Sequence, residues 1–201
     1  FRELCDKYAR NGPDYVEMVT RIVGYHSVKL PGQQGVDNKS KMHNFLGILM
    51  AEFSAIGDGL AYTTTSQDGA DLMLRLDGLS GIMFQVCKEM ESSVSSLWAK
   101  ALKQMLAALQ KRLRDYAHGV RDASTWPSLG KVLFLQLLGR IYSVTDMQHA
   151  LVTPAMLLMC QYLTQCPVSS LQDLSTGLMV SSVLVDFTEG SKRIVPEVTS
   201  F

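Results

Sequence analysis

The sequence predicts an all-α fold, built as an antiparallel helical array. Apolar residues recur at spacings of three and four along most of the 201 residues, as on the buried face of a helix. The period-two alternation that is typical of half-buried strands does not occur in the sequence. Proline, glycine and small polar residues stand between the apolar segments, where helices begin and end.

The N-terminal part of the chain predicts a helix followed by a loop. Pro13 and Asp14 are favourable in the first turn of a helix, and an apolar face follows them to a stop near His26. Residues 27–37 contain proline, glycine and glutamine without helical spacing of apolar residues, so a loop is expected there.

Two further helices are expected before the longest amphipathic segment. Asn38 is a good N-cap for the first of them, which is expected to fray at 57–59. A second loop is expected over 58–70, because Gly, Thr, Ser and Asp dominate this stretch. Leucine, methionine and valine resume the helical spacing over 71–90 and predict the next helix.

The clearest amphipathic segment spans about 93 to 118. Its apolar residues step by three and four and form one stripe: Val94, Trp98, Ala101, Leu102, Met105, Leu109, Leu113 and Tyr116. Lys100, Lys103, Lys111 and Arg114 form what we call the cationic face. At roughly 100° per residue these four lie within about 80° of one another, opposite the stripe.

Two more helices are expected to follow. The first starts at 126–127 and is apolar on nearly all sides over 131–142, which predicts a central helix covered by its neighbours. Thr153 is expected to cap the second and Pro154 to begin it, and the helix is expected to end at 166–167.

The last predicted helix is capped by Ser169 or Ser170 and ends at 189–190, and residues 191–201 are expected to form an irregular tail. The short links favour a HEAT- or armadillo-like solenoid segment, with an irregular helical bundle as the alternative. No clean repeat is visible, but such repeats diverge strongly. Residues 1–201 are expected to form a single all-α region.

The stretch 144–155 carries an aspartate and a histidine in otherwise apolar surroundings. Asp146 and His149 lie three positions apart, so they would share one face of a helical turn. A carboxylate that orients an imidazole is a common catalytic arrangement, but it also satisfies polar groups where a chain turns. The known nucleophile, phosphate-loop and zinc-protease motifs do not accompany them. No catalytic residue is therefore assigned, and these two residues with Thr153 and Pro154 are expected to form a structural joint.

Composition excludes several function classes. The 19 basic and 19 acidic residues balance, so bulk charge does not favour nucleic acid or an anionic membrane. The four cysteines form no C-x-x-C pair and the four histidines are scattered, so neither a metal nor a cofactor is expected. Charged and polar residues interrupt every apolar run before the ~18 residues that a membrane helix needs. The abrupt start at Phe1, without a signal peptide, is expected of a piece of a larger protein.

Residues 145–168, TDMQHALVTPAMLLMCQYLTQCPV, resemble the signature of the nucleolar protein 14 family, in which Ser/Thr-Asp, a His and a Thr-Pro-Ala opening an apolar helix follow in order. Residues 142–145 depart from the aromatic-Pro-Ser lead of many members. Other elements of the family are resembled by four stretches: 38–50, 126–129, 173–178 and 191–198. The highly charged N-terminal half that the family carries has no counterpart here, so the chain resembles the family's C-terminal helical region.

The resemblance implies a non-enzymatic scaffold of the small-subunit processome, the nucleolar assembly that folds and cuts pre-ribosomal RNA. It implies four partners: a helical protein of the nucleolar complex protein 4 type, the pseudouridine-N1 methyltransferase of the processome, pre-ribosomal RNA and small nucleolar ribonucleoprotein. The alternative function is that of a helical-repeat adaptor in another nuclear pathway, such as nuclear transport.

Two groups of basic residues are candidates for contact with an RNA backbone. One is the cationic face, and the other is Lys192 with Arg193 in the expected tail. The alternative for the cationic face is an ordinary solvated helix surface. No aromatic residues interleave with it as a stacking platform, so sequence-specific reading of RNA is not expected.

Overall fold

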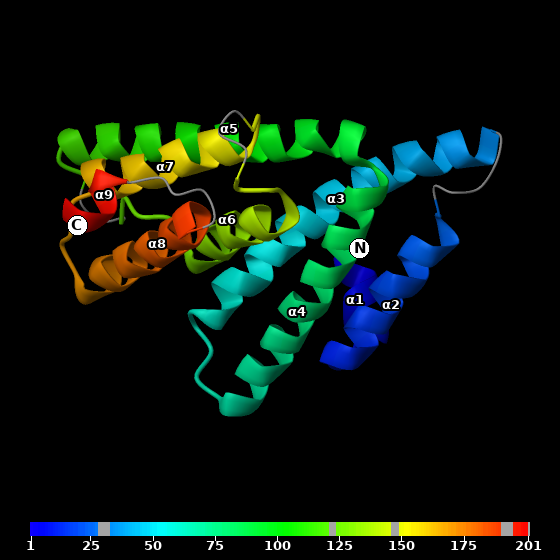
Figure 1. Ribbon diagram of the computed structural model, residues 1–201. Coiled ribbons are helices and arrows are strands. Elements are labelled where there is room, and N and C mark those ends of the chain that lie inside the picture. Colours follow the sequence, from blue (N-terminus) through cyan, green and yellow to red (C-terminus); the bar gives the residue numbers. More distant parts are fainter. Residues whose placement is uncertain (28–32, 121–123, 146–148, 190–194, 201) are drawn as a thin grey trace. The chain divides into compact units, whose positions relative to one another are not determined.

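The computed structural model (Figure 1) describes these residues: 1–27, 33–120, 124–145, 149–189 and 195–200. Within these ranges the chain forms nine α-helices and no strand, which confirms the all-α prediction. The chain divides into two compact units, Phe1–Val94 and Ser95–Phe201. The solenoid-like arrangement and the single helical region stay predictions.

The helices of the first unit are α1 (Arg2–Tyr8), α2 (Gly12–Tyr25), α3 (Gln33–Leu60) and α4 (Ser66–Glu89). The α4 helix packs against both α2 and α3, and α1 packs against α2. The predicted start of α2 is confirmed, because the Asn11 side chain accepts a hydrogen bond from the Asp14 amide at 2.9 Å and a proline occupies the first turn. The core of the unit includes five completely buried side chains: Tyr15, Val19, Leu46, Leu49 and Leu79.

The α2 and α4 helices run parallel, because two contacts follow in the same order along both. The Gly12 amide donates a hydrogen bond to the Asp71 carboxylate, and Val16 packs against Gly78 further along each helix. A Cβ atom at Gly78 would collide with both methyl groups of Val16. The glycine therefore permits the close approach of the two helices.

The loop predicted over 27–37 is wrong at 33–37, and the prediction that Asn38 caps a helix is also wrong. Residues 33–37 already belong to α3, and residues 28–32 lie outside the described residues. Asn38 lies inside α3 with only 4% of its surface exposed, and its side-chain amide donates to the Ser27 carbonyl at 3.1 Å. This tertiary hydrogen bond, formed just after the end of α2, uses the side chain that the sequence assigned to a cap.

The predicted loop over 58–70 is also wrong at both ends, since α3 continues to Leu60 and α4 begins at Ser66. Thr65 caps α4, where its hydroxyl accepts a hydrogen bond from the Asp68 amide at 3.2 Å and donates one to the Asp68 carboxylate. This N-cap explains why residues 66–70 are helical.

The second unit contains most of α5 (Glu91–Ala117), whose first residues lie in the first unit. Its other helices are α6 (Leu129–Ile141), α7 (Val152–Gln165), α8 (Leu171–Glu189) and α9 (Pro196–Ser200). The α8 helix packs along α6 and α7, and α9 contacts α7 and α8 (Figure 1). The irregular tail is a wrong prediction for 196–200, where Pro196 opens a short helix.

The apolar residues that were predicted to be buried on α6 and α5 are largely buried in the structure. Residues on several sides of α6 are buried, which confirms the prediction of a covered helix: Gly130, Val132, Phe134, Leu135, Leu137 and Leu138. On α5, five residues of the predicted apolar stripe are buried: Val94, Trp98, Leu102, Met105 and Leu109. All four residues of the cationic face are exposed.

Candidate interaction surfaces

The start of α7 is organised by His149. Its Nδ1 atom accepts hydrogen bonds from the Leu151 and Val152 amides, each at 3.2 Å, and its carbonyl accepts one from the Thr153 amide at 3.2 Å. Amides in the first turn of a helix have no partner within the helix, so the imidazole takes the place of a cap. Because Nδ1 accepts, the proton of the neutral ring is on Nε2.

The four residues of the predicted joint have different outcomes. The His149 imidazole has backbone amides as its hydrogen-bond partners. Thr153 does not cap α7, because the helix begins one residue earlier, at Val152, and Pro154 lies within its first turn. Asp146 lies outside the described residues, so its predicted role in the joint stays a prediction.

Aromatic rings extend this joint toward α5 and α6. The His149 ring is tilted against Tyr142 with ring centroids 5.3 Å apart, and Tyr142 meets Trp98 edge to face at 6.0 Å. Trp98 stacks on Phe134 at 4.5 Å and is completely buried. Such ring contacts favour one relative orientation, so they fix where α7 begins relative to α5 and α6.

A second polar centre lies at the start of α8, around Asp173, a residue with only 6% of its surface exposed. Its carboxylate accepts hydrogen bonds from the Ser124 hydroxyl at 2.7 Å and from the Ser169 amide at 3.1 Å. The Ser170 hydroxyl accepts from the Asp173 amide at 3.0 Å, which makes Ser170 the cap of α8, as predicted. The two residues form a capping box whose carboxylate also reaches a segment 49 positions earlier.

The segment that Asp173 holds is anchored on further sides. The Trp126 indole donates to the Pro167 carbonyl at 2.9 Å, and Arg112 on α5 donates to the Trp126 carbonyl at 2.7 Å. The Cys166 thiol donates to the Thr125 carbonyl at 3.6 Å. The turn before α6 is therefore tied to α5, to the end of α7 and to the start of α8, and we call this set of contacts the Trp126 knot.

Hydrogen bonding and burial shift two pKa values in the knot. Burial by itself raises the pKa of the Asp173 carboxyl, but the hydrogen bonds from Ser124 and Ser169 outweigh it, and the pKa lies below its ordinary value of 3.8. Burial raises the pKa of the Cys166 thiol to about 11, against the lowering effect of its hydrogen bond to Thr125. The first stays ionised and the second stays protonated near neutral pH, as a structural role requires.

The sequence alone does not predict the Trp126 knot. Part of the signal was present, because Ser170 and Asp173 match the S-x-x-D spacing of a capping box. The partners Ser124 and Arg112 come from distant segments, so only the folded chain brings them together.

The second unit also has an apolar groove between α5 and α7, here called the α5–α7 groove, with a volume of about 270 Å³. Its walls are mainly apolar: Ala99, Leu102 and Leu106 from α5, and Pro154, Leu157 and Leu158 from α7. Lys103 and Gln161 add polar groups to the lining. Lys103 also belongs to the cationic face, so the two features adjoin. The other predicted RNA contacts, Lys192 and Arg193, lie outside the described residues.

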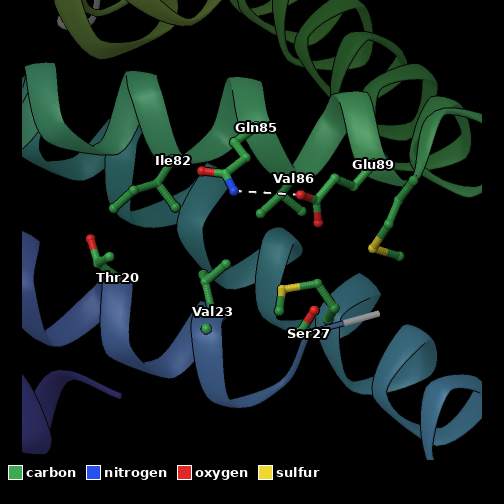
Figure 2. A pocket seen from close by; sticks show the side chains of 10 residues that line it. Thr20, Val23, Ser27, Ile82, Gln85, Val86 and Glu89 are labelled. Atoms are coloured by element: carbon green, nitrogen blue, oxygen red, sulfur yellow. Dashed lines mark hydrogen bonds between the residues drawn. The ribbon is translucent and has the colours of Figure 1, made fainter. Parts of the chain in front are cut away.

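The first unit has a more polar pocket of about 240 Å³ between α2, α3 and α4. Figure 2 shows Gln85 and Glu89 on α4 on one side of it, with Thr20 and Ser27 on the other. The Gln85 amide donates to the Glu89 carboxylate at 3.4 Å, so this pair faces the pocket as one polar edge.

Two kinds of feature are absent from the described ranges. No helix there combines the length and the apolar character that crossing a membrane requires. No group of three or more histidine, cysteine, aspartate or glutamate side chains there is arranged to hold a metal ion.

Comparison with known proteins places the chain beside a family of nucleolar proteins. The sequence model of the Nop14-like family matches residues 1–201. Nucleolar protein 14 of Mus musculus is 28% identical over 166 residues, which are 83% of this chain and 18% of that protein. Nucleolar protein 14 of Homo sapiens is 26% identical over 164 residues, or 82% of this chain and 18% of that protein. The probable nucleolar complex protein 14 of Schizosaccharomyces pombe is 29% identical over 185 residues, or 92% of this chain and 20% of that protein. The chain thus spans about a fifth of the length of these relatives.

Proposed function

The chain belongs to the Nop14-like family, and from this premise we propose that it is a non-enzymatic scaffold in ribosome biogenesis. The observation that carries the proposal is the match of the family model to residues 1–201. Relatives in animals and fungi are named as nucleolar proteins, which supports a nucleolar location for this chain. Its proposed task there is to support pre-ribosomal RNA processing and small-subunit assembly within the small-subunit processome.

The geometry supports a scaffold in two ways. His149, the residue most suggestive of acid–base chemistry, has its Nδ1 atom bonded to two backbone amides, which is the arrangement of a structural group. The Trp126 knot ties α5, α6, α7 and α8 together around one turn. A rigid helical unit offers fixed surfaces to partners, as helical arrays with solenoid-like stacking do.

The proposed partners are those that the sequence resemblance implies. They are a helical protein of the nucleolar complex protein 4 type, the pseudouridine-N1 methyltransferase of the processome, pre-ribosomal RNA and small nucleolar ribonucleoprotein. The cationic face is proposed to contribute contacts with the RNA backbone, since all four of its residues are exposed.

Co-purification tests the proposed function. The full-length protein is expressed together with the helical partner and separated by size-exclusion chromatography. We expect the two to elute as one heterodimer, and we expect pre-ribosomal RNA in material drawn from nuclear extract. A protein that stays monomeric beside its partner at micromolar concentration would contradict the proposal. Recovery of transport factors with their cargo, in place of pre-ribosomal RNA, would favour the adaptor function instead.

A further inference from the structure

The α5–α7 groove leaves apolar surface of the second unit open to solvent. Leu157 has 60% of its surface exposed, and it lines the groove together with Leu102 and Leu106 from the opposite wall. A hollow of about 270 Å³ with apolar walls is large enough for one or two leucine-sized side chains. A concave site with mainly apolar walls and a few polar groups is the usual form of a binding site.

The two helices that form the walls of the groove carry charges of one sign along it. From Ser92 to Arg114 the α5 segment has five basic residues and no acidic one. The α7 helix, which forms the opposite wall, contains no charged residue. Lys103 is itself one of the residues that line the groove. The occupant that complements these charges is acidic.

The dimensions of the groove match a helix. The lining residues run from Ala99 to Leu106 on α5 and from Pro154 to Gln161 on α7. Each stretch is about 10 Å long at roughly 1.5 Å per residue, or two turns of an α-helix. Two turns present anchors at i, i+4 and i+7, the spacing by which an amphipathic helix binds in a groove.

We propose that the α5–α7 groove binds an amphipathic helix of a partner protein, with leucine-like anchors in the groove and aspartate or glutamate residues beside Lys103. The proposal rests on the proposed scaffold function and names one surface that this function uses. The apolar lining disfavours RNA, because phosphates against it would lose water without gaining hydrogen bonds. Trp98, Trp126 and Phe134 are buried, so these rings offer bases no stacking surface.

A selection experiment tests which chemistry the groove prefers. A phage-displayed library of random peptides of about 16 residues, long enough for a groove-binding helix, is panned against the whole chain. We expect enriched peptides with leucine, phenylalanine or methionine at helical spacing and an excess of aspartate and glutamate. Absence of an enriched motif, or enrichment of basic peptides, would overturn the proposal.

Binding of the enriched peptide to variants then locates the site. By fluorescence anisotropy, Leu157→Ser and Lys103→Glu should each weaken binding about tenfold or more, as for a central anchor and a contacting charge. The matched controls are Leu178→Ser, an exposed leucine on α8, and Lys41→Glu, an exposed lysine on α3, and both should bind as the parent chain does. Thermal melts verify that the variants are folded, and equal binding by parent and Leu157→Ser would overturn the proposal.

Two further measurements distinguish a peptide-binding groove from an RNA site, and a failure of the groove assignment from a failure of the scaffold function. If a uridine RNA of about 20 nucleotides, longer than one typical single-strand site, bound the chain and lost affinity in Leu157→Ser, the groove would be an RNA site and the proposal would be overturned. If the selected peptides ignored the groove while the helical partner still co-eluted, the groove assignment would fail and the scaffold function would stand. Loss of co-elution in the parent chain would instead remove the scaffold function itself.

Discussion

The Ser124 hydroxyl donates a hydrogen bond of 2.7 Å to the Asp173 carboxylate across 49 positions of sequence. This bond joins the turn before α6 to the cap of α8, so one carboxylate serves both a local and a distant partner. We expect Asp173→Ala to lower the free energy of unfolding by about 1–3 kcal/mol, because buried donors lose their acceptor. Asp173→Asn keeps the shape and one acceptor oxygen, and should cost less. Urea denaturation measures both, and an Asp173→Ala variant as stable as the parent would contradict the role of the knot.

The same carboxylate gives stability a dependence on pH. The pKa of Asp173 is lowered in the folded chain from its ordinary value of 3.8, so folding favours the ionised form. Its contribution is therefore complete above the unfolded pKa and is lost as the pH falls through the folded pKa. We expect the stability difference between the parent and Asp173→Asn to be constant from about pH 6 to 8 and to shrink below about pH 4. Melts across this range test it, and a difference that grew toward low pH would have the wrong sign.

At the start of α7, His149→Ala should destabilise the chain by about 1 kcal/mol, the usual effect of losing an N-terminal cap. The reason is that the amides of Leu151 and Val152 lose the Nδ1 atom that accepts their hydrogen bonds. His149→Asn is the matched control. It supplies another acceptor near these amides and should therefore lose less stability than His149→Ala. Equal melting temperatures for the parent and His149→Ala would show that the imidazole does not act as a cap.

In the first unit, Gly78→Ala should destabilise by about 1–3 kcal/mol, because the added methyl group collides with Val16 on α2. The collision exceeds the gain of roughly 1 kcal/mol that alanine brings to a helix interior. Gly81→Ala is the control on the same helix, since a Cβ there meets nothing within 4 Å, and it should be neutral or stabilising. Combining Gly78→Ala with Val16→Ala should recover part of the lost stability. A neutral Gly78→Ala would show that α2 and α4 do not approach closely at this point.

The sequence predicted the fold correctly where one helical spacing of apolar residues continued over several turns. The stripe of α5 and the apolar α6 were expected, because repeated spacing over several turns leaves few alternatives. Two of the wrong predictions lie at 33–37 and 66–70, where glycine and polar residues favoured loops, but the Thr65 cap and the Asn38 contact favour helix. Short-range propensity is weak, and tertiary contacts override it.

The functional surfaces were less accessible to sequence reasoning than the helices. The Asp146–His149 pair is a local pattern in the sequence, yet the described hydrogen bonds of the His149 imidazole are with backbone amides of its own turn. The Trp126 knot and the α5–α7 groove each combine segments separated by more than 40 positions, and no local pattern marks such a pairing. The cationic face was visible because all of its members lie on one helix.

The cationic face itself is open to a direct test of RNA contact. Changing Lys100, Lys103, Lys111 and Arg114 together to glutamate should weaken binding to single-stranded RNA at low salt about tenfold or more, because four candidate phosphate contacts become repulsive. The fold should be unaffected, since all four side chains are exposed. The matched control makes the same charge changes at four other exposed positions: Lys39, Lys41, Lys88 and Arg140. Filter binding across a salt series measures the affinities. If both variants lost affinity equally, only net charge would matter, and if the first variant lost none, the face would be an ordinary solvated surface.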